Sequence, residues 1–154
     1  MDAFEENRDG RRRIATTPRN PWEGVRIVKE LQLVGEFGLR NKTELWTHLT
    51  MVKSHKSQAK KLLITTNKEE FMTEGRALLN YLYKMGIISG VDYNDEADIS
   101  RCLKEVLNLD LSHYLNRRLQ SLVFKAGLAT NIHHARCLIV QKQITVMGRV
   151  VNKP

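Results

Sequence analysis

The stretch RRLQSLVFKAGLATNIHHAR, residues 117–136, decides the fold of the C-terminal part of the chain. Its apolar residues recur three or four positions apart on both sides of Gly127, which is the spacing of two short amphipathic helices joined by a turn. Arg118, Ser121 and Lys125 share another side of the first helix, so we expect them to face outward. The expected inner faces are Leu115, Leu119, Leu122, Val123 and Ala126 on the first helix, and Ile132, Ala135, Leu138 and Ile139 on the second.

The residues that follow these two helices indicate a small β-hairpin. In QITVMGRVV, residues 143–151, apolar and polar residues alternate ahead of a Met-Gly turn. Thr130 or Asn131 is expected to cap the start of the second helix, because both side chains can accept a hydrogen bond from a backbone N–H. The predicted fold class is therefore mainly α, with a helical N-terminal domain and a module of two short helices and a small sheet.

The charge of the chain is concentrated in this module. The formal net charge is +8, and residues 111–154 hold seven lysines and arginines but no aspartate or glutamate. We therefore expect that no carboxylate of the protein neutralises these cations. Such a surface attracts phosphate groups, and the attraction weakens as salt is added.

The two adjacent histidines in the opening stretch are poor candidates for metal binding or catalysis. His133 and His134 point roughly 100° apart on a helix, so they do not converge on one ion. His133 and Cys137 lie one turn apart, but a structural zinc site needs about four ligands and the neighbouring sequence supplies no others. No carboxylate lies in this block to act with a histidine, and no nucleophile or phosphate-loop motif is present. We expect no cofactor, no metal and no enzymatic activity.

Several helices are predicted over residues 21–110. Asn41 with Glu44, and Thr66 with Glu69, have the spacing of a capping box and are predicted to start two of them. These residues are expected to form the helical N-terminal domain.

Two segments before residue 111 are predicted to be irregular. Residues 1–20 read as an extended basic arm, which contains three consecutive arginines and a proline. Residues 89–98 are polar and acidic and read as a loop, after which a short helix is expected over 99–107.

A row of lysines recurs along the helix that starts near Asn41. Lys53, Lys56 and Lys60 are three and seven positions apart and share one side. Either this row is an ordinary solvated edge, or it adds to a surface that contacts a polyanion.

The sequence gives weaker indications of the cellular compartment and of membrane association. The chain has no apolar run near the roughly 18 residues of a membrane span. Its first residues include several acids, unlike a transit peptide. Cys102 and Cys137 lie far apart and form no disulfide framework, which suits a reducing compartment.

The sequence resembles the universal small-subunit ribosomal protein S-four family in its eukaryotic and archaeal form. RRLQSLVFKAGLATNIHHARCLIVQKQITV (117–146) is similar to the RNA-binding module of that family. TPRNPW (17–22), KELQLVGEFGLRNKTELW (29–46) and TEGRALLNYLYKMGII (73–88) resemble its N-terminal helical region, in the same order. The module alone also occurs in RNA-modifying enzymes and tRNA synthetases, whereas its combination with the upstream elements is far more specific.

The resemblance implies a structural protein that binds small-subunit rRNA near the point where mRNA enters, and that supports subunit assembly and translational fidelity. The implied partners are rRNA, neighbouring small-subunit proteins and mRNA, without a membrane, in the cytoplasm after passage through the nucleolus. The residues that match RNA-contacting positions of the family are Arg40, Asn41, Lys42, Arg117, Arg118, Lys125, Asn131, His133, His134 and Arg136. The other expected RNA-binding residues are Arg11, Arg12, Arg13, Arg19, Lys53, Lys56, Lys60, Thr130, Lys142 and Arg149.

The resemblance also implies a module over residues 111–154 that is shortened at its C-terminal end. Family members usually continue past the proline matched by Pro154 with a further strand, so we expect the sheet either to be incomplete or to be closed by another protein or by RNA. The main alternative function is that of an assembly factor of the small-subunit processome, which carries the same module. An RNA-modifying or aminoacylating enzyme is a third class, but it needs a catalytic domain that residues 1–110 do not resemble.

Overall fold

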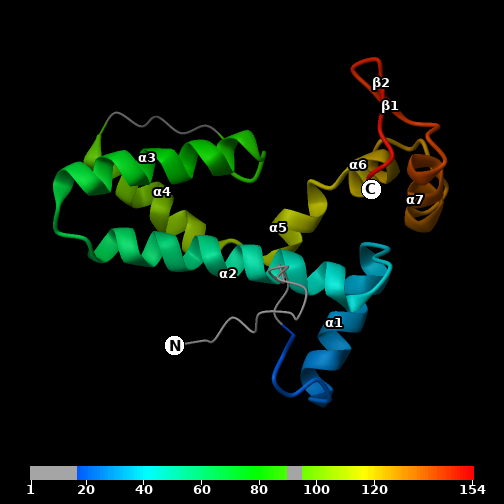
Figure 1. Cartoon of the computed structure of the whole chain (residues 1–154), viewed down its shortest axis with the longest axis horizontal. Coiled ribbons are helices and arrows are strands. Elements are labelled where there is room, and N and C mark those ends of the chain that lie inside the picture. The colour runs from blue at the N-terminus through cyan, green and yellow to red at the C-terminus, as the bar shows by residue number, and fades with distance from the viewer. Residues whose placement is uncertain (1–16, 90–94) are drawn as a thin grey trace, which may run out of the picture. The chain divides into compact units, whose positions relative to one another are not determined.

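The computed structural model of the chain describes residues 17–89 and 95–154 (Figure 1). The fold is mainly α with one small antiparallel sheet, as the sequence predicted. Within the described ranges, no helix is long and apolar enough to cross a lipid bilayer. The elements are α1 (Gly24–Glu36), α2 (Lys42–Ile64), α3 (Lys68–Lys84), α4 (Glu96–Asn108), α5 (Leu111–Asn116), α6 (Leu119–Lys125), α7 (Ile132–Val140), β1 (Thr145–Val146) and β2 (Arg149–Val150).

The chain folds into two compact units. Unit 1 contains the described residues up to Thr50 together with Leu119–Pro154, and unit 2 contains Met51–Arg118. The helix α2 therefore supplies its N-terminal part to unit 1 and the rest to unit 2. These boundaries differ from the predicted division into residues 21–110 and 111–154, because α1 and the start of α2 pack with the C-terminal residues.

Unit 2 is a small helical core formed by α2, α3 and α4. Figure 1 shows α3 and α4 alongside the second part of α2. Gly75 on α3 permits close packing, since a Cβ atom there would lie 3.0 Å from Ile99 Cγ2 on α4. The buried members of this core are Ala59, Leu62, Phe71, Leu78, Leu79, Leu82, Ile99, Cys102, Leu103 and Val106.

A buried aromatic pair links α2 to α5 within unit 2. His55 Nδ1 lies 2.8 Å from the hydroxyl of Tyr114, and the two rings stack with their centroids 5.8 Å apart. Burial, and secondarily the charge of Arg117, lowers the pKa of His55 below its ordinary value of 6.5. Burial also raises the pKa of Tyr114 to about 12. The pair therefore remains neutral at pH 7 and needs no counter-ion.

Unit 1 has its own small core, to which the hairpin is attached. Val123, Ala129, Ala135 and Ile139 are buried, and Ile144 packs against them. The strands pair Thr145 with Val150 and Val146 with Arg149. Met147 and Gly148 both have positive φ angles, 49° and 76°, as a tight two-residue hairpin turn requires. The predicted hairpin and its Met-Gly turn are confirmed.

One predicted helix start is confirmed and another is shifted. Asn41 Oδ1 accepts a hydrogen bond from Glu44 N at 3.3 Å, as a cap of α2 should. The cap of α3 is Asn67, whose side chain accepts from Glu69 N at 3.2 Å. Thr66, the predicted cap, lies outside the helix, because Asn67 provides the acceptor one position later. The helix α4 begins at Glu96, inside the segment that was predicted to be a loop.

The first helix of the predicted module is in fact two helices. α5 ends at Asn116 and α6 begins at Leu119, so the apolar spacing across this break does not describe one face. Leu122, predicted to be buried, is 50% exposed, while Ser121, predicted to face outward, is buried. Ala126, another predicted inner residue, is exposed after the end of α6.

Candidate nucleic-acid interface

The start of α7 is fixed by local hydrogen bonds. Asn131 Oδ1 accepts from His134 N at 2.6 Å, which identifies Asn131 rather than Thr130 as the cap. His134 Nδ1 in turn accepts from the backbone N–H of Thr130 at 3.3 Å and contacts its hydroxyl at 3.1 Å. Because Nδ1 accepts, the proton of a neutral His134 ring resides on Nε2. Thr130, Asn131 and His134 thus shape the turn before α7, and this leaves His134 Nε2–H as a donor.

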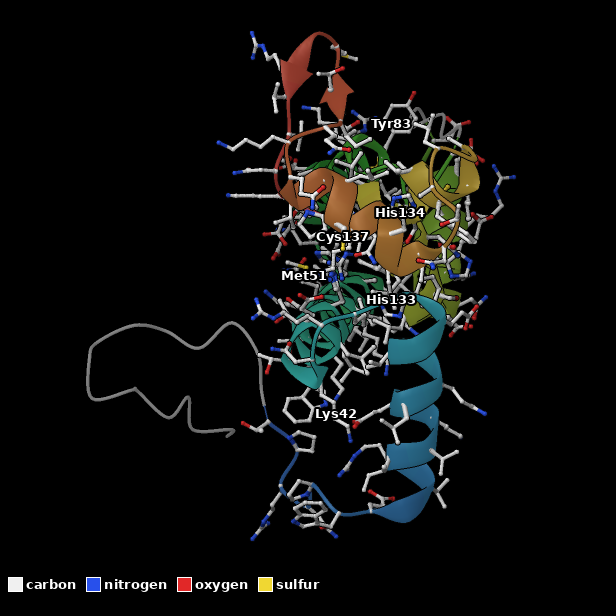
Figure 2. All side chains as sticks on the ribbon, turned by 90° about the vertical axis from the view of Figure 1, so that its right-hand side faces the viewer. Lys42, Met51, Tyr83, His133, His134 and Cys137 are labelled. Carbon is white, nitrogen blue, oxygen red and sulfur yellow. The ribbon has the colours of Figure 1, made fainter. Side chains whose placement is uncertain are left out.

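His133 lies beside this turn and is exposed. Figure 2 shows His133, His134 and Cys137 along α7. Within residues 17–89 and 95–154, no three histidine, cysteine, aspartate or glutamate side chains gather as metal ligands would. His133 and His134 are both exposed, so their imidazole nitrogens are accessible to a hydrogen-bonding partner.

Arg136 is held by a carboxylate from a distant part of the sequence. Its Nη2 lies 2.6 Å from Glu44 Oε1 and its Nη1 lies 3.2 Å from Glu44 Oε2, a two-pronged ion pair between α7 and α2. The expectation that no carboxylate neutralises the cations of the module is therefore wrong for Arg136. The charge count over residues 111–154 could not include an acid that the fold brings in from α2.

Gln120 completes this polar cluster from the buried side of α6. Its side chain is only 1% exposed. Its Nε2 donates to Gly38 O and to Ile132 O, both at 3.0 Å, and its Oε1 accepts from Arg136 Nη1 at 3.3 Å. Since a buried amide is costly unless its polar atoms are paired, Gln120 is suited to join α6 and α7 to the turn before α2. We call Gly38, Glu44, Gln120 and Arg136 the polar clamp.

Gly38 permits the close approach on which the polar clamp depends. Its φ is +57°, and a Cβ atom there would lie 2.7 Å from Gln120 Nε2 and 2.8 Å from Ile132 Cγ2. Neither Gln120 nor Glu44 was predicted from the sequence as a partner of Arg136. The periodic pattern gives no signal for a buried glutamine, because polar residues normally mark the outer face of a helix.

The turn between α1 and α2 holds three predicted contact residues with different surroundings. Arg40 is exposed, whereas Asn41 caps α2. Lys42 Nζ lies 3.4 Å from Glu30 Oε2. Glu30 is buried and also accepts from Trp46 Nε1 at 3.0 Å. Lys42 thus compensates a buried carboxylate, and Arg40 is the cation of this turn that faces solvent.

Other predicted contact residues of the module differ in accessibility. Lys125, Lys142 and Arg149 are exposed, and Arg118 is partly exposed. Arg117 is partly buried within unit 2, where its Nη1 donates to Met85 O at 3.3 Å. The C-terminal end of unit 1 therefore presents cations on α6, on the loop after α7 and on β2.

The remaining predicted contacts lie on other parts of the chain. Lys53 and Lys60 are exposed on the unit 2 part of α2, and Lys56 on the same row is partly exposed. Arg19 is exposed ahead of α1. The other three predicted contacts, Arg11, Arg12 and Arg13, lie outside the described residues.

Comparison with known protein families identifies the module. Residues 117–154 match the S4 domain. The S4 domain is an RNA-binding module, so the predicted resemblance of the C-terminal stretch to an RNA-binding module is confirmed. The match covers α6, α7 and the hairpin, whereas Gly38 and Glu44 of the polar clamp lie outside it.

Proposed function

We propose that this S4-domain protein is a structural constituent of the small ribosomal subunit, where it binds small-subunit rRNA. One observation carries the proposal: the polar clamp joins the S4 domain to an upstream motif. Gly38 and Glu44 belong to GEFGLRNKTELW, residues 35–46, and bond to Gln120 and Arg136 of the S4 domain. The two elements whose combination resembles the ribosomal family are thus in direct contact within unit 1.

The exposed cations around the S4 domain support binding to folded RNA. Arg40, Lys125, Lys142 and Arg149 are exposed, and guanidinium and ammonium groups bind phosphate. His133 adds an exposed imidazole at the start of α7. We assign the phosphate contacts to these five residues. The contacts predicted at Thr130, Asn131, Lys42 and Arg136 we assign mainly to positioning, because these side chains bond within the protein.

The more specific role that we propose is based on the resemblance of the sequence to the ribosomal family. We propose that the protein sits near the point where mRNA enters the small subunit, contacts neighbouring small-subunit proteins there, and supports subunit assembly and translational fidelity. In a eukaryotic cell it would act in the cytoplasm after assembly in the nucleolus. We propose no catalytic role, because the S4 domain is a binding module.

Sedimentation of a cell lysate tests the ribosomal role against the assembly-factor alternative. A tagged full-length chain is expressed in its source cells, and the fractions of a sucrose gradient are probed for the tag. We expect the chain in free small subunits, monosomes and polysomes, and we expect dissociation of polysomes to shift it to the small-subunit peak. Confinement to precursor particles would contradict the proposal and favour the processome factor.

A further inference from the structure

A cavity of about 520 Å³ opens between α2 and α3 in unit 2, away from the S4 domain in sequence. Leu62 and Leu78 are buried and form an apolar part of its wall. Tyr81, also in the wall, is 51% exposed and so presents an accessible aromatic ring. The lining residues are His55, Gln58, Lys61, Leu62, Glu74, Ala77, Leu78 and Tyr81.

Tyr81, an aromatic residue in the wall of this cavity, packs against the ring of His55. The His55 ring meets the Tyr81 ring edge to face, with centroids 5.6 Å apart and planes at 71°. His55 is itself fixed by the hydrogen bond to Tyr114 at 2.8 Å. The lowered pKa of His55 keeps this ring uncharged at pH 7. Tyr81 thus packs against an uncharged ring that is itself hydrogen-bonded to Tyr114.

The polar groups of the cavity offer both donors and acceptors. Gln58 can donate and accept, Glu74 accepts, and Lys61 donates with a positive charge. In the described part of the chain, neither Lys61 nor Glu74 takes part in an ion pair. Both charges therefore remain available to a ligand.

We propose that this cavity binds one unpaired RNA nucleotide, with its base stacked against Tyr81, an amino group of the base donating to Glu74, and its phosphate beside Lys61. The proposal rests on the proposed function in taking RNA as the partner. Unpaired bases are commonly bound by stacking on aromatic side chains together with hydrogen bonds to their edges. A carboxylate acceptor favours guanosine, which carries adjacent N–H donors, over uridine, whose single N–H is flanked by carbonyl oxygens.

The charged side chains that line the cavity, Lys61 and Glu74, favour RNA over an apolar protein segment as the occupant. Residues 51–64 of α2 contain Lys53, Lys56, Lys60 and Lys61 but no acidic residue. At about 100° per residue, Lys53, Lys56 and Lys60 lie on the opposite side of α2 from the side that lines the cavity, so Lys61 is the lysine of this stretch that can meet a phosphate there. An apolar peptide side chain would use Leu62 and Leu78 but would leave Lys61 and Glu74 without partners.

Binding of the full-length chain to labelled RNA hairpins tests the proposal. One hairpin is fully paired, and the others carry a single bulged guanosine or uridine. Fluorescence anisotropy should show the bulged guanosine hairpin binding tighter than the paired one by at least about fivefold, the lower end of what one stacked base contributes. The bulged uridine hairpin should bind more weakly than the guanosine one.

Two tyrosines on α3 provide a matched pair of variants. Tyr81→Leu should abolish the preference for the bulge, and Tyr81→Phe should keep it, because stacking needs only the ring. Tyr83 is 54% exposed but does not line the cavity, so Tyr83→Leu should behave as wild type. Figure 2 shows Tyr83 at the surface. Glu74 is exposed, and Glu74→Gln should reduce the preference for guanosine over uridine. This variant tests the hydrogen bond to the base independently of the stacking on Tyr81.

The outcomes separate this proposal from the ribosomal one. Equal binding of paired and bulged hairpins by the wild type, or an undiminished bulge preference in Tyr81→Leu, would overturn the nucleotide cavity even if the chain sediments with polysomes. A bulge preference that disappears in Tyr81→Leu but persists in Tyr81→Phe and Tyr83→Leu would support nucleotide binding in the cavity, even if sedimentation contradicts the ribosomal role.

Discussion

The role expected for Arg136 from the sequence differs from the role that the structure indicates. In the sequence it is one of seven cations without a nearby acid, but in the fold it makes a two-pronged ion pair with Glu44 and a hydrogen bond to Gln120. The side chains of Arg136 and Glu44 are 19% and 26% exposed, so water screens this pair only in part. The residue therefore positions α7 more than it offers charge to a phosphate.

The ion pair should be measurable by a double-mutant cycle. We expect Arg136→Ala and Glu44→Ala each to lower the free energy of unfolding by about 1–3 kcal/mol, the usual range for a hydrogen-bonded charge. The double variant should lose less than the sum of the two, because either change alone leaves the partner unpaired. Urea denaturation measures all three, with the exposed Arg149→Ala as a control expected within about 0.5 kcal/mol of wild type. Strictly additive losses would show that Arg136 and Glu44 do not interact.

His55 gives the protein a pH dependence of stability. Its pKa is lowered in the folded state from an ordinary value of 6.5, so the unfolded chain binds more protons in the pH range below that value. Stability should therefore fall as the pH drops from about 6.5 towards the lowered pKa, and His55 should contribute no such slope at higher pH. In thermal denaturation between pH 8 and pH 5, His55→Gln should lessen the loss on acidification. His133→Gln, at an exposed position, serves as the control and should retain the wild-type loss of stability on acidification. A full acid-induced loss of stability in His55→Gln would show that His55 is not the group responsible.

At the level of elements, the turn between α1 and α2 bonds directly to the helices of the S4 domain. Gly38 lets Gln120 and Ile132 approach the backbone, and the carbonyl of Gly38 accepts from Gln120. The turn thereby fixes α6 and α7 and also presents Arg40. The RNA-binding surface that we propose for unit 1 is consequently built from two separate parts of the sequence.

Three glycine substitutions distinguish close packing from backbone strain. Gly38→Ala should lower the free energy of unfolding by about 2–4 kcal/mol, because a positive φ and steric overlap act together. Gly86 also has a positive φ, +69°, but nothing lies near its missing Cβ, so Gly86→Ala should cost only about 1–2 kcal/mol. Gly35→Ala, inside α1 with open space around it, should be neutral or stabilising. Equal losses at Gly38 and Gly86 in chemical denaturation would rule out the close approach.

Element types followed from the sequence because they depend on local chemistry. The spacing of apolar residues predicted α7, and the Met-Gly pair predicted the hairpin turn between β1 and β2. The break between α5 and α6 did not follow, since no glycine or proline marks it and the apolar spacing continues across it. The polar clamp was equally hidden, because it joins residues as far as 98 positions apart along the chain.

At the scale of the whole molecule, positive charge is available on both units but in different settings. Unit 1 carries the exposed cations of the S4 domain, and unit 2 carries the lysine row of α2. The sequence could predict which residues are cationic, but not which of them are bonded within the protein. Arg117, Arg136 and Lys42 are so bonded. Lys142 and Arg149, exposed cations of the S4 domain, are therefore the sharper target for an experiment on RNA binding.

The salt dependence of binding to a small-subunit rRNA fragment tests the central claim, that exposed cations of the S4 domain neutralise RNA phosphates. Affinities of the full-length chain are measured over a range of salt concentrations for wild type, for Lys142→Ala with Arg149→Ala, and for Lys84→Ala with Lys104→Ala on α3 and α4 as a control of equal charge. The S4-domain variant should bind more weakly and lose about one unit of salt slope for each phosphate contact removed, about two in all, while the control keeps the wild-type slope. Identical slopes for wild type and the S4-domain variant would contradict the claim.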